Sequence, residues 1–429
     1  MTKKIKNAWA FYDWANSVYS LVIASAIFPI YYNAVTSSEA SSDVNLFGFT
    51  LNNNALYSYS LSFSFLVVAL LSPLLSGIAD SNGKKKNFLR FFCYLGSVSC
   101  ASLYFFTGPN LVYGLVASIL ASIGFWSSIV FYNSFLPEIA PPEEQDALSA
   151  KGFSLGYIGS SILLIVVLVL VQMPETFGFE NSGSATRFSF LLVGAWWMGF
   201  ATYTLRYLPN NPYHKKPQER YIWKGYQELR KVYRQLSEHK SLGKFLGSFF
   251  FFSIGVQTVL LLASLFGSEE LGLDSSKLIV TILLIQFVAI AGAHLFARIA
   301  RKKGNLIALK ISIGIWVLLC VGAYTLSKTD PWVEYKFYAL GAIVGLVMGG
   351  IQSVSRSTYS KLLPETQSHA SFFSFYDVAE KVAIVLGTLI YGWLVQITGS
   401  MKMSILALSV FFIIGFVLML RVPKTKEVH

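Results

Sequence analysis

The sequence predicts an all-α membrane protein in which twelve transmembrane helices form two six-helix bundles. Three observations support this fold class. First, the 429 residues are 54% hydrophobic and only 13% charged, whereas a soluble domain carries about 25% charged residues. Second, apolar runs of about 20 residues, long enough to cross a bilayer as a helix, recur along the whole chain. Third, one segment of the first half reappears in the second half.

The apolar runs place six helices before a polar connector and six after it. The first run is too long and too polar on one side for a cleaved signal peptide, so we interpret it as a retained helix. The expected spans are 9–32, 55–79, 88–106, 111–135, 153–172, 187–207, 244–266, 278–298, 305–326, 335–360, 371–398 and 401–420. They divide the chain into a first bundle at 1–207, a connector at 208–243 and a second bundle at 244–429.

The net charge of +12 is distributed as a topology signal rather than as a nucleic-acid surface. Lys and Arg gather at both termini, in the connector and in alternate loops, as they do in cytoplasmic loops. The other loops hold only five: Arg187, Lys277, Lys328, Lys336 and Lys402. We therefore expect cytoplasmic termini, a multi-pass protein of the inner cell membrane, and no nucleic-acid partner.

The connector carries apolar residues at alternating spacings of four and three, which predicts an amphipathic helix joining the two bundles. The stripe consists of Ile222, Tyr226, Leu229, Tyr233 and Leu236. A helix lying on the cytoplasmic membrane surface and a solvated linker helix both fit this pattern.

The repeated segment reads "FLPEIAPPEEQDALSAKGFSLGYIGS" after the fourth span and "LLPETQSHASFFSFYDVAEKVAIVLG" after the tenth. The Leu-Pro-Glu triplets start at Leu136 and Leu363, 227 residues apart, and each leads to a glycine in the next span, Gly159 or Gly387. A parallel repeat of two six-helix halves is typical of the major facilitator superfamily, whose substrate sites lie near the bilayer midplane between the halves.

A second superfamily feature follows the second span, in "SGIADSNGKKKNFL". Asp80, Gly83 and Lys84 match in part the superfamily's signature for this loop, in which Gly makes a tight turn and an acid can lock the bundles together. We predict these three as conformational residues. Two glycine series, Gly152, Gly156 and Gly159 in the fifth span and Gly341, Gly345 and Gly349 in the tenth, predict close helix packing.

The resemblance extends to one branch of that superfamily. "FYDWANSVYS", "GVQTVLLLASLFGSEELGL", "SVSRSTYSKLLPE" and "FFSFYD" resemble the vacuolar amino-acid effluxer-like, autophagy-related family, and the likeness covers residues 9–420. It implies a secondary transporter whose fungal relatives are associated with release of amino acids from the vacuole. Members often have an acid where Ile254 stands, and Gly and Pro where Ser374 and Thr388 stand.

Polar residues inside the first span predict a surface that avoids lipid. Asp13, Asn16, Ser17 and Ser20 share one helix face, and a charge in a span usually faces the bundle interior or a pathway. We expect this face to line the substrate cavity. Asp13 paired with bases at the headgroup boundary remains an open interpretation.

The eleventh span carries the charge nearest the membrane centre, because Lys381 lies about 6 Å from the midplane. Asp377, one turn earlier, can pair with it. We expect Lys381 to bind an anionic group of the substrate or to exchange partners between Asp377 and the first helix; a merely structural pair is the alternative. Glu380, expected on another side of the helix, is a weaker candidate for ion coupling. Gln257 is a candidate hydrogen-bonding residue in the seventh span.

Arg356, near the cytoplasmic end of the tenth span, is predicted as a gate or a topology anchor. Together these residues describe a monomeric secondary active transporter that moves a small polar solute, such as an amino acid, by alternating access with protons as the coupling ion. Membrane lipid is expected to surround the protein. No cofactor, metal site or enzymatic motif is expected. A drug or metabolite exporter of the same fold and a transport-inactive membrane sensor or scaffold remain open alternatives.

Overall fold

The computed structural model describes residues 1–37, 43–46, 48–210, 213 and 221–423. Within this part of the chain, twelve helical segments are long and apolar enough to cross a membrane, so the predicted fold class is confirmed. The first segment runs from α1 (Lys3–Val18) through a π-helical stretch (Tyr19–Ile27) into α2 (Phe28–Thr36). Pro29 at the start of α2 has no backbone N–H to donate, which accounts for the break in regular α-helical bonding before it.

The remaining helices follow the predicted spans closely. The first bundle continues with α3 (Asn53–Asn82), α4 (Lys85–Ser102), α5 (Leu111–Asn133), the short α6 (Leu136–Ile139), α7 (Pro142–Gln172) and α8 (Ser182–Tyr207). After α9 (Tyr221–Glu238), the second bundle consists of α10 (Lys240–Leu265), α11 (Ser275–Lys303), α12 (Asn305–Thr325), α13 (Val333–Leu362), α14 (His369–Thr398) and α15 (Met401–Leu420).

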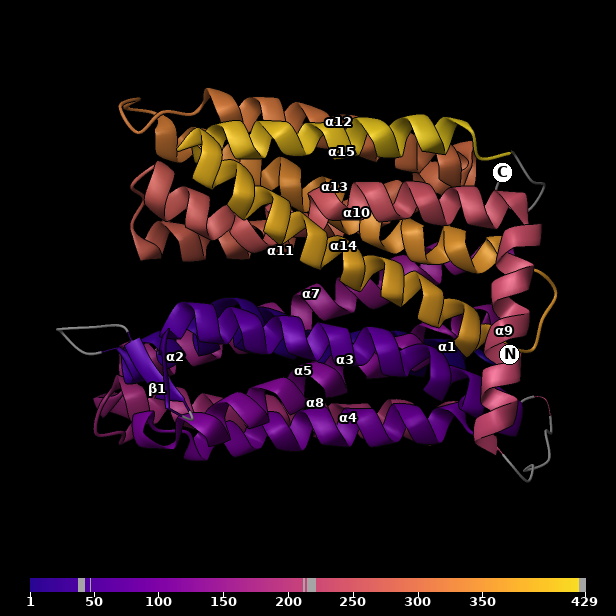
Figure 1. Cartoon of the computed structure of the whole chain (residues 1–429), viewed down its shortest axis with the longest axis horizontal. Helices are drawn as coiled ribbons and strands as arrows, with labels where there is room; N and C mark the ends of the chain where they lie inside the picture. Colours follow the sequence, from indigo (N-terminus) through magenta and orange to yellow (C-terminus); the bar gives the residue numbers. More distant parts are fainter. Residues whose placement is uncertain (38–42, 47, 211–212, 214–220, 424–429) are drawn as a thin grey trace.

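The spans form two groups, each around its own apolar core (Figure 1). Two helices of corresponding position in the repeat make the main contacts between the groups. Helix α7 of the first bundle packs against α11 and α13, and α14 of the second packs against α3 and α5. The seam between the bundles is therefore built mainly from the fifth and eleventh spans, the pair that carries the repeated sequence.

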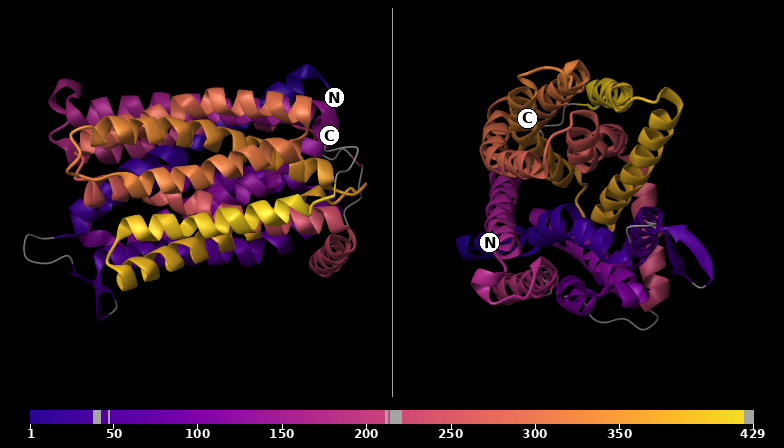
Figure 2. Two further views of the ribbon diagram at one scale, coloured as in Figure 1. Left: turned by 90° about the horizontal axis from the view of Figure 1, so that it is seen from above. Right: turned by 90° about the vertical axis from the view of Figure 1, so that its left-hand side faces the viewer.

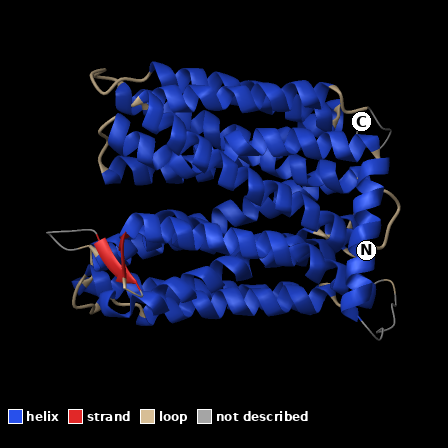
Figure 3. Ribbon diagram, in the orientation of Figure 1, coloured by secondary structure: helices blue, strands red, loops and turns tan. Residues whose placement is uncertain are grey.

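The two ends of the bundles differ. The start of α1 and the end of α15 lie at one end, which we call the termini side (Figure 1). At the opposite end, β1 (Asp43–Leu46) and β2 (Phe49–Asn52) form an antiparallel hairpin (Figure 3), so we call this end the hairpin side. The expected spans at 9–32 and 55–79 left this segment in a loop, with no strand expected. Gly48 in the turn has a φ of 87°, which glycine adopts at no steric cost.

Helix α9 lies across the ends of the spans on the termini side (Figures 1 and 2). Its predicted apolar stripe divides between two surroundings: Leu236 is buried, whereas Tyr226 and Tyr233 are exposed. The face toward the protein instead includes Gly225 and Val232, which no apolar period singled out. The side chain of Ile222 falls outside the described set.

Glycines allow backbones to touch in both bundles. A Cβ on Gly349 of α13 would stand 2.1 Å from the carbonyl oxygen of Ala289 in α11, and one on Gly345 would stand 2.5 Å from that of Ile285. Such distances are below any van der Waals contact, so only glycine allows this approach. The contact between α11 and α13 is the most extensive in the described protein, as the glycine series predicted.

Candidate substrate and gating sites

A charged cluster lies midway along α14. The Lys381 ammonium nitrogen is 3.0 Å from Asp377 Oδ1 and 3.0 Å from Glu380 Oε2. Gln257 of α10 donates from Nε2 to Glu380 Oε1 at 2.9 Å. The spacing of four residues correctly indicated the ion pair with Asp377. Glu380, expected on another side of the helix, also joins the cluster, because the long lysine stem lets the ammonium reach the carboxylate of the preceding residue.

This cluster lies at the seam between the bundles. The Lys381 nitrogen stands 3.6 Å from the ring centroid of Trp126, which belongs to α5 of the first bundle. A desolvated cation over an indole face is held by the ring quadrupole, and Lys381 is only 1% exposed. Trp126 was missed in the sequence analysis, since a tryptophan within an apolar span carries no signal that distinguishes a contact residue from a packing residue.

The charges in the cluster do not balance. One ammonium faces two carboxylates, and apart from the Lys381 ion pair neither carboxylate oxygen of Asp377 has a hydrogen-bond partner in the described structure. With all three groups ionised the site carries a net charge of −1 at bilayer depth, where uncompensated charge is costly. The site therefore favours one additional positive charge, either a proton or a cationic group of a ligand.

Asp13 lies in a second cluster, at the termini side. Its Oδ2 accepts from Arg356 Nη1 and Nη2 at 3.2 and 3.1 Å and from the Tyr132 hydroxyl at 2.9 Å. Arg356 belongs to α13 and Asp13 to α1, so this buried ion pair joins the two bundles. The structure thus places Asp13 in an inter-bundle contact with a base, rather than beside Lys381 in a shared cavity.

The guanidinium of Arg356 is held from several sides by the first bundle. Nε donates to Ser149 Oγ at 2.9 Å, Nη2 to the Ser149 carbonyl oxygen at 2.9 Å, and Nη1 to Asn133 Oδ1 at 3.2 Å. The ring centroids of Trp9 and Phe153 lie 4.8 and 4.1 Å from its central carbon. These contacts use the planar fork that distinguishes arginine from lysine. We refer to Arg356, Asp13 and these partners as the arginine lock.

Two glycines of α7 make room for the lock and for α1. A Cβ on Gly152 would stand 2.4 Å from Asp13 Oδ2 and 2.9 Å from Arg356 Nη2, and one on Gly156 would stand 2.4 Å from Ser17 Oγ. The predicted polar face of α1 therefore packs against α7. Asn16 on that face is 1% exposed, and its Nδ2 has no hydrogen-bond partner among the described residues.

Further polar contacts cross the seam near the lock. Lys361 of α13 is paired with Asp146 of α7 at 2.7 Å, and Asn305 of α12 donates to the other Asp146 oxygen at 2.7 Å. Asp80 at the end of α3 accepts from the Ser371 backbone N–H at 2.7 Å and from its hydroxyl at 2.8 Å. Because Ser371 lies in the first turn of α14, Asp80 places a carboxylate at the positive end of that helix.

The loop after α3 contains the predicted Gly83 and Lys84. Gly83 has a φ of 66°, which fits its predicted place in a tight turn. Lys84 is exposed, whereas the neighbouring Lys85 is buried and forms an ion pair with Glu138 of α6. The Oε1 atom of Glu138 also lies 3.0 Å from Nδ1 of His369 in α14. In this run of three lysines, sequence spacing alone does not distinguish the two buried side chains, Lys85 and Lys86, from the exposed Lys84.

Comparison with known proteins gives the family. The model of the family described as "Vacuole effluxer Atg22 like" matches residues 1–428. The chain belongs to the Atg22-like family. A relative in Bacillus subtilis, described as an uncharacterized MFS-type transporter, YxiO, is 32% identical over 98% of this chain and 95% of its own length. Autophagy-related protein 22 of Yarrowia lipolytica is 25% identical over 87% of this chain and 76% of its own length.

Solved structures agree on the fold of this Atg22-like protein. The major facilitator proton:xylose symporter XylE superposes with a TM-score of 0.73 at 15% identity, covering 99% of this chain and 96% of its own. A bacterial homologue of the iron transporter ferroportin, in an outward-facing state, gives a TM-score of 0.66 at 12% identity, over 97% of this chain and 98% of its own. The Atg22-like chain is thus a multi-pass transporter of the major facilitator type and not an enzyme.

Proposed function

We propose that this Atg22-like protein is a proton-coupled secondary active transporter that moves a small zwitterionic solute of the amino-acid type by alternating access. The charged cluster of Lys381, Asp377 and Glu380 carries this proposal. It combines a cation and two carboxylates at bilayer depth, and Trp126 brings it into contact with the opposite bundle.

The cluster matches an amino acid in the sign of its charges. The ammonium of Lys381 attracts the carboxylate of the substrate. The ion pairs of Lys381 with Asp377 and Glu380 are then weakened, so one of these two carboxylates attracts the ammonium of the substrate. Without substrate, one proton taken up by the cluster neutralises its net charge of −1. Substrate binding and proton uptake therefore involve the same charged cluster, which is the chemical basis for coupling solute movement to a proton gradient.

The arginine lock and its neighbours supply the gate on the termini side. Asp80, Asp146 and Asp13 of the first bundle each bind a group of the second, so the described conformation is joined at that end. In the opposite conformation these contacts separate while those on the hairpin side close, and the Lys381 cluster is reached from alternate sides of the membrane.

The distribution of Lys and Arg supports a cytoplasmic termini side. On that basis we place the protein in the cell membrane as a monomer whose gate, in the described conformation, is closed toward the cytoplasm.

Transport by purified protein in liposomes tests the proposal. We expect uptake of radiolabelled amino acids to rise when a pH gradient is imposed and to fall to background in Lys381→Ala. Lys277→Ala is the matched control, because Lys277 also pairs with an acid of the second bundle, Glu334, at 2.7 Å, but at a partly exposed site on the hairpin side. Wild-type flux in Lys381→Ala would exclude this cluster from the site, and flux indifferent to the pH gradient would exclude proton coupling.

The same vesicles separate the amino-acid proposal from an exporter of drugs or other metabolites. A mixture of labelled amino acids and a mixture of cationic dyes are offered in parallel. Transport of dyes alone would replace the substrate class that we propose, and transport of neither under any imposed gradient would favour a sensor or scaffold.

A further inference from the structure

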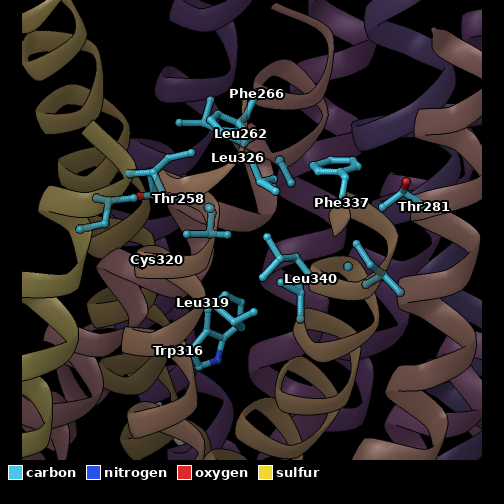
Figure 4. Close-up of a pocket in the computed structure, with 18 of the residues that line it drawn as sticks. Thr258, Leu262, Phe266, Thr281, Trp316, Leu319, Cys320, Leu326, Phe337 and Leu340 are labelled. Atoms are coloured by element: carbon cyan, nitrogen blue, oxygen red, sulfur yellow. The ribbon is translucent and has the colours of Figure 1, made fainter. Parts of the chain in front are cut away.

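Helix α9 carries three exposed aromatic side chains, which we call the aromatic row. Trp223, Tyr226 and Tyr233 are 61%, 50% and 67% exposed, and the rings of Trp223 and Tyr226 stack with centroids 5.8 Å apart. In contrast, Trp316 and Phe266 of the second bundle line an apolar recess in its interior (Figure 4). Aromatic rings that gather on an exposed helix face indicate a surface that contacts something other than water.

Helix α9 lies at the depth where the spans leave the hydrocarbon. Its Gly225 packs against Gly77 of α3, five residues before α3 ends at Asn82, which is about 8 Å at 1.5 Å per residue. Helix α3 has 30 residues and is therefore about 45 Å long, whereas the hydrocarbon core is about 30 Å thick. About 7 Å of α3 thus projects at each end into the headgroup layer. Figure 2 shows α9 at the outer edge of the two bundles, so it lies beside the spans at headgroup level.

Two contacts with α14 fix which side of α9 faces the bilayer. Glu228 accepts from the hydroxyl of Ser368, immediately before the first residue of α14. The ring of Tyr233 instead lies 6.2 Å from that of Phe375, seven residues further along the chain and about 10 Å deeper. Tyr226 shares the side of Tyr233, because seven residues make two helical turns. The aromatic row therefore faces the membrane, and Glu228 faces away from it.

Two arginines follow the aromatic row on the outward face of α9. Arg230 and Arg234 are one helical turn apart and both are exposed. No carboxylate pairs with either in the described part of the chain, since Glu228 is paired with Lys231 at 3.7 Å. A guanidinium binds phosphate oxygens through two parallel hydrogen bonds, and aromatic side chains are enriched at the boundary between headgroups and hydrocarbon. The two features together fit the chemistry of a phospholipid surface.

We propose that α9 binds anionic phospholipids, with the aromatic row at the headgroup boundary and Arg230 and Arg234 on the lipid phosphates. Residues 221–238 include four basic and two acidic side chains, and this excess of positive charge is attracted to an anionic leaflet. A free phosphate ion makes no use of the aromatic row, so we assign the phosphate to lipid. The proposal does not rest on the transport proposal, because it involves neither the Lys381 cluster nor the arginine lock.

Quenching of Trp223 by brominated lipids tests this proposal in the purified full-length protein, reconstituted in lipid nanodiscs. Bromine quenches tryptophan fluorescence on contact, and the difference between the parent protein and Trp223→Phe isolates this residue among the nine tryptophans. Brominated phosphatidylglycerol, which is anionic, is mixed at increasing mole fraction into phosphatidylcholine, and brominated phosphatidylcholine provides the neutral comparison. We expect half-maximal quenching at a mole fraction of the anionic lipid that is lower by at least about fivefold, the effect of one basic residue near an anionic surface.

The variants Arg230→Gln and Arg234→Gln each remove one charge and keep a long polar side chain. Each should raise the mole fraction of anionic lipid at half-maximal quenching by about three- to fivefold. Arg301→Gln and Lys302→Gln are matched controls, because these basic residues are also exposed and lie near the end of α11. They should leave the quenching of Trp223 unchanged.

Three outcomes would overturn the proposal. If neither brominated lipid quenches Trp223, α9 is a solvated linker helix. If the two lipids quench it equally, or the arginine variants behave as the parent does, the helix touches the membrane without recognising its charge. If inorganic phosphate abolishes the preference while sodium chloride of the same ionic strength does not, the arginines form a site for a free anion rather than for lipid.

Discussion

Replacement of Asp13 by asparagine tests the arginine lock directly. The substitution keeps the shape of the side chain and removes its charge, leaving the buried guanidinium of Arg356 without its counter-ion. The side chains of Arg356 and Asp13 are only 4% and 10% exposed. Breaking a buried ion pair by removing one partner costs about 3–5 kcal/mol. Arg356 retains its bonds to Ser149 and Asn133, so we expect the lower end, about 3 kcal/mol.

This cost falls on one conformation only. When the bundles separate at the termini side, water reaches both groups and the pair contributes little. Asp13→Asn therefore destabilises the closed arrangement relative to the open one, and because about 1.4 kcal/mol corresponds to a tenfold change, the ratio of the two states shifts by about a hundredfold. A free-energy difference of this size changes the populations of the two states enough to be measured.

Distances between spin labels measure that redistribution. Asn87 near the start of α4 and Lys302 near the end of α11 are exposed, lie at the termini side in different bundles, and can be replaced by labelled cysteine. The native Cys93, Cys100 and Cys320 are buried. We expect one distance in the parent and a longer second distance in Asp13→Asn. Glu334→Gln, which breaks a partly exposed pair on the hairpin side, should change the populations by less than about fivefold. An unchanged distance distribution in folded Asp13→Asn protein would refute our account of the lock.

Three further predictions use the same preparation. Gly152→Ala places a Cβ 2.4 Å from Asp13 Oδ2 and should lengthen the spin-label distance as Asp13→Asn does. Gly199→Ala, with nothing within 4 Å of the added carbon, should leave the distance unchanged. Equal effects of the two substitutions would show that steric exclusion at Gly152 is unimportant. Asp80→Asn removes a carboxylate from the N-terminus of α14 and should favour the open state by about 1 kcal/mol. The longer distance should therefore appear, with a smaller population than in Asp13→Asn. A reporter enzyme active only in the cytoplasm, fused after the last residue, should be active; an inactive fusion with an active periplasmic counterpart would reverse our assignment of sides.

The apolar runs predicted the spans because hydrophobic length is a local property of the sequence. The main difference is α7, which starts at Pro142 although we expected the span to begin at 153. Its first turns carry charged residues that no hydropathy window includes, yet a proline at the first helical position favours helix initiation. Asp146 and Ser149 on those turns bind the second bundle, so the polar extension is held by tertiary contacts.

Pairs within one helix could also be predicted, and pairs between helices could not. Asp377 and Lys381 are four residues apart, so helical geometry alone brings them together. Asp13 and Arg356 are 343 residues apart, and each was singled out as a polar residue in a span without any indication of the other. Only the packing of α7 against both α1 and α13 shows that the two candidates form one unit.

Helix α9 determines how the two bundles can part. It meets α3 backbone to backbone, since a Cβ on Gly77 would stand 2.3 Å from the Gly225 carbonyl oxygen. Its hold on α14 is slighter: Glu228 accepts from the Ser368 hydroxyl, and the Tyr233 and Phe375 rings lie 6.2 Å apart. Its far end is joined firmly to the second bundle, because Val232 and Leu236 pack into that bundle's core and only His239 separates α9 from α10. The covalent connection between the halves therefore behaves as a rigid arm held at both ends rather than as a slack tether, and separation of α3 from α14 must bend this arm or break one of its contacts.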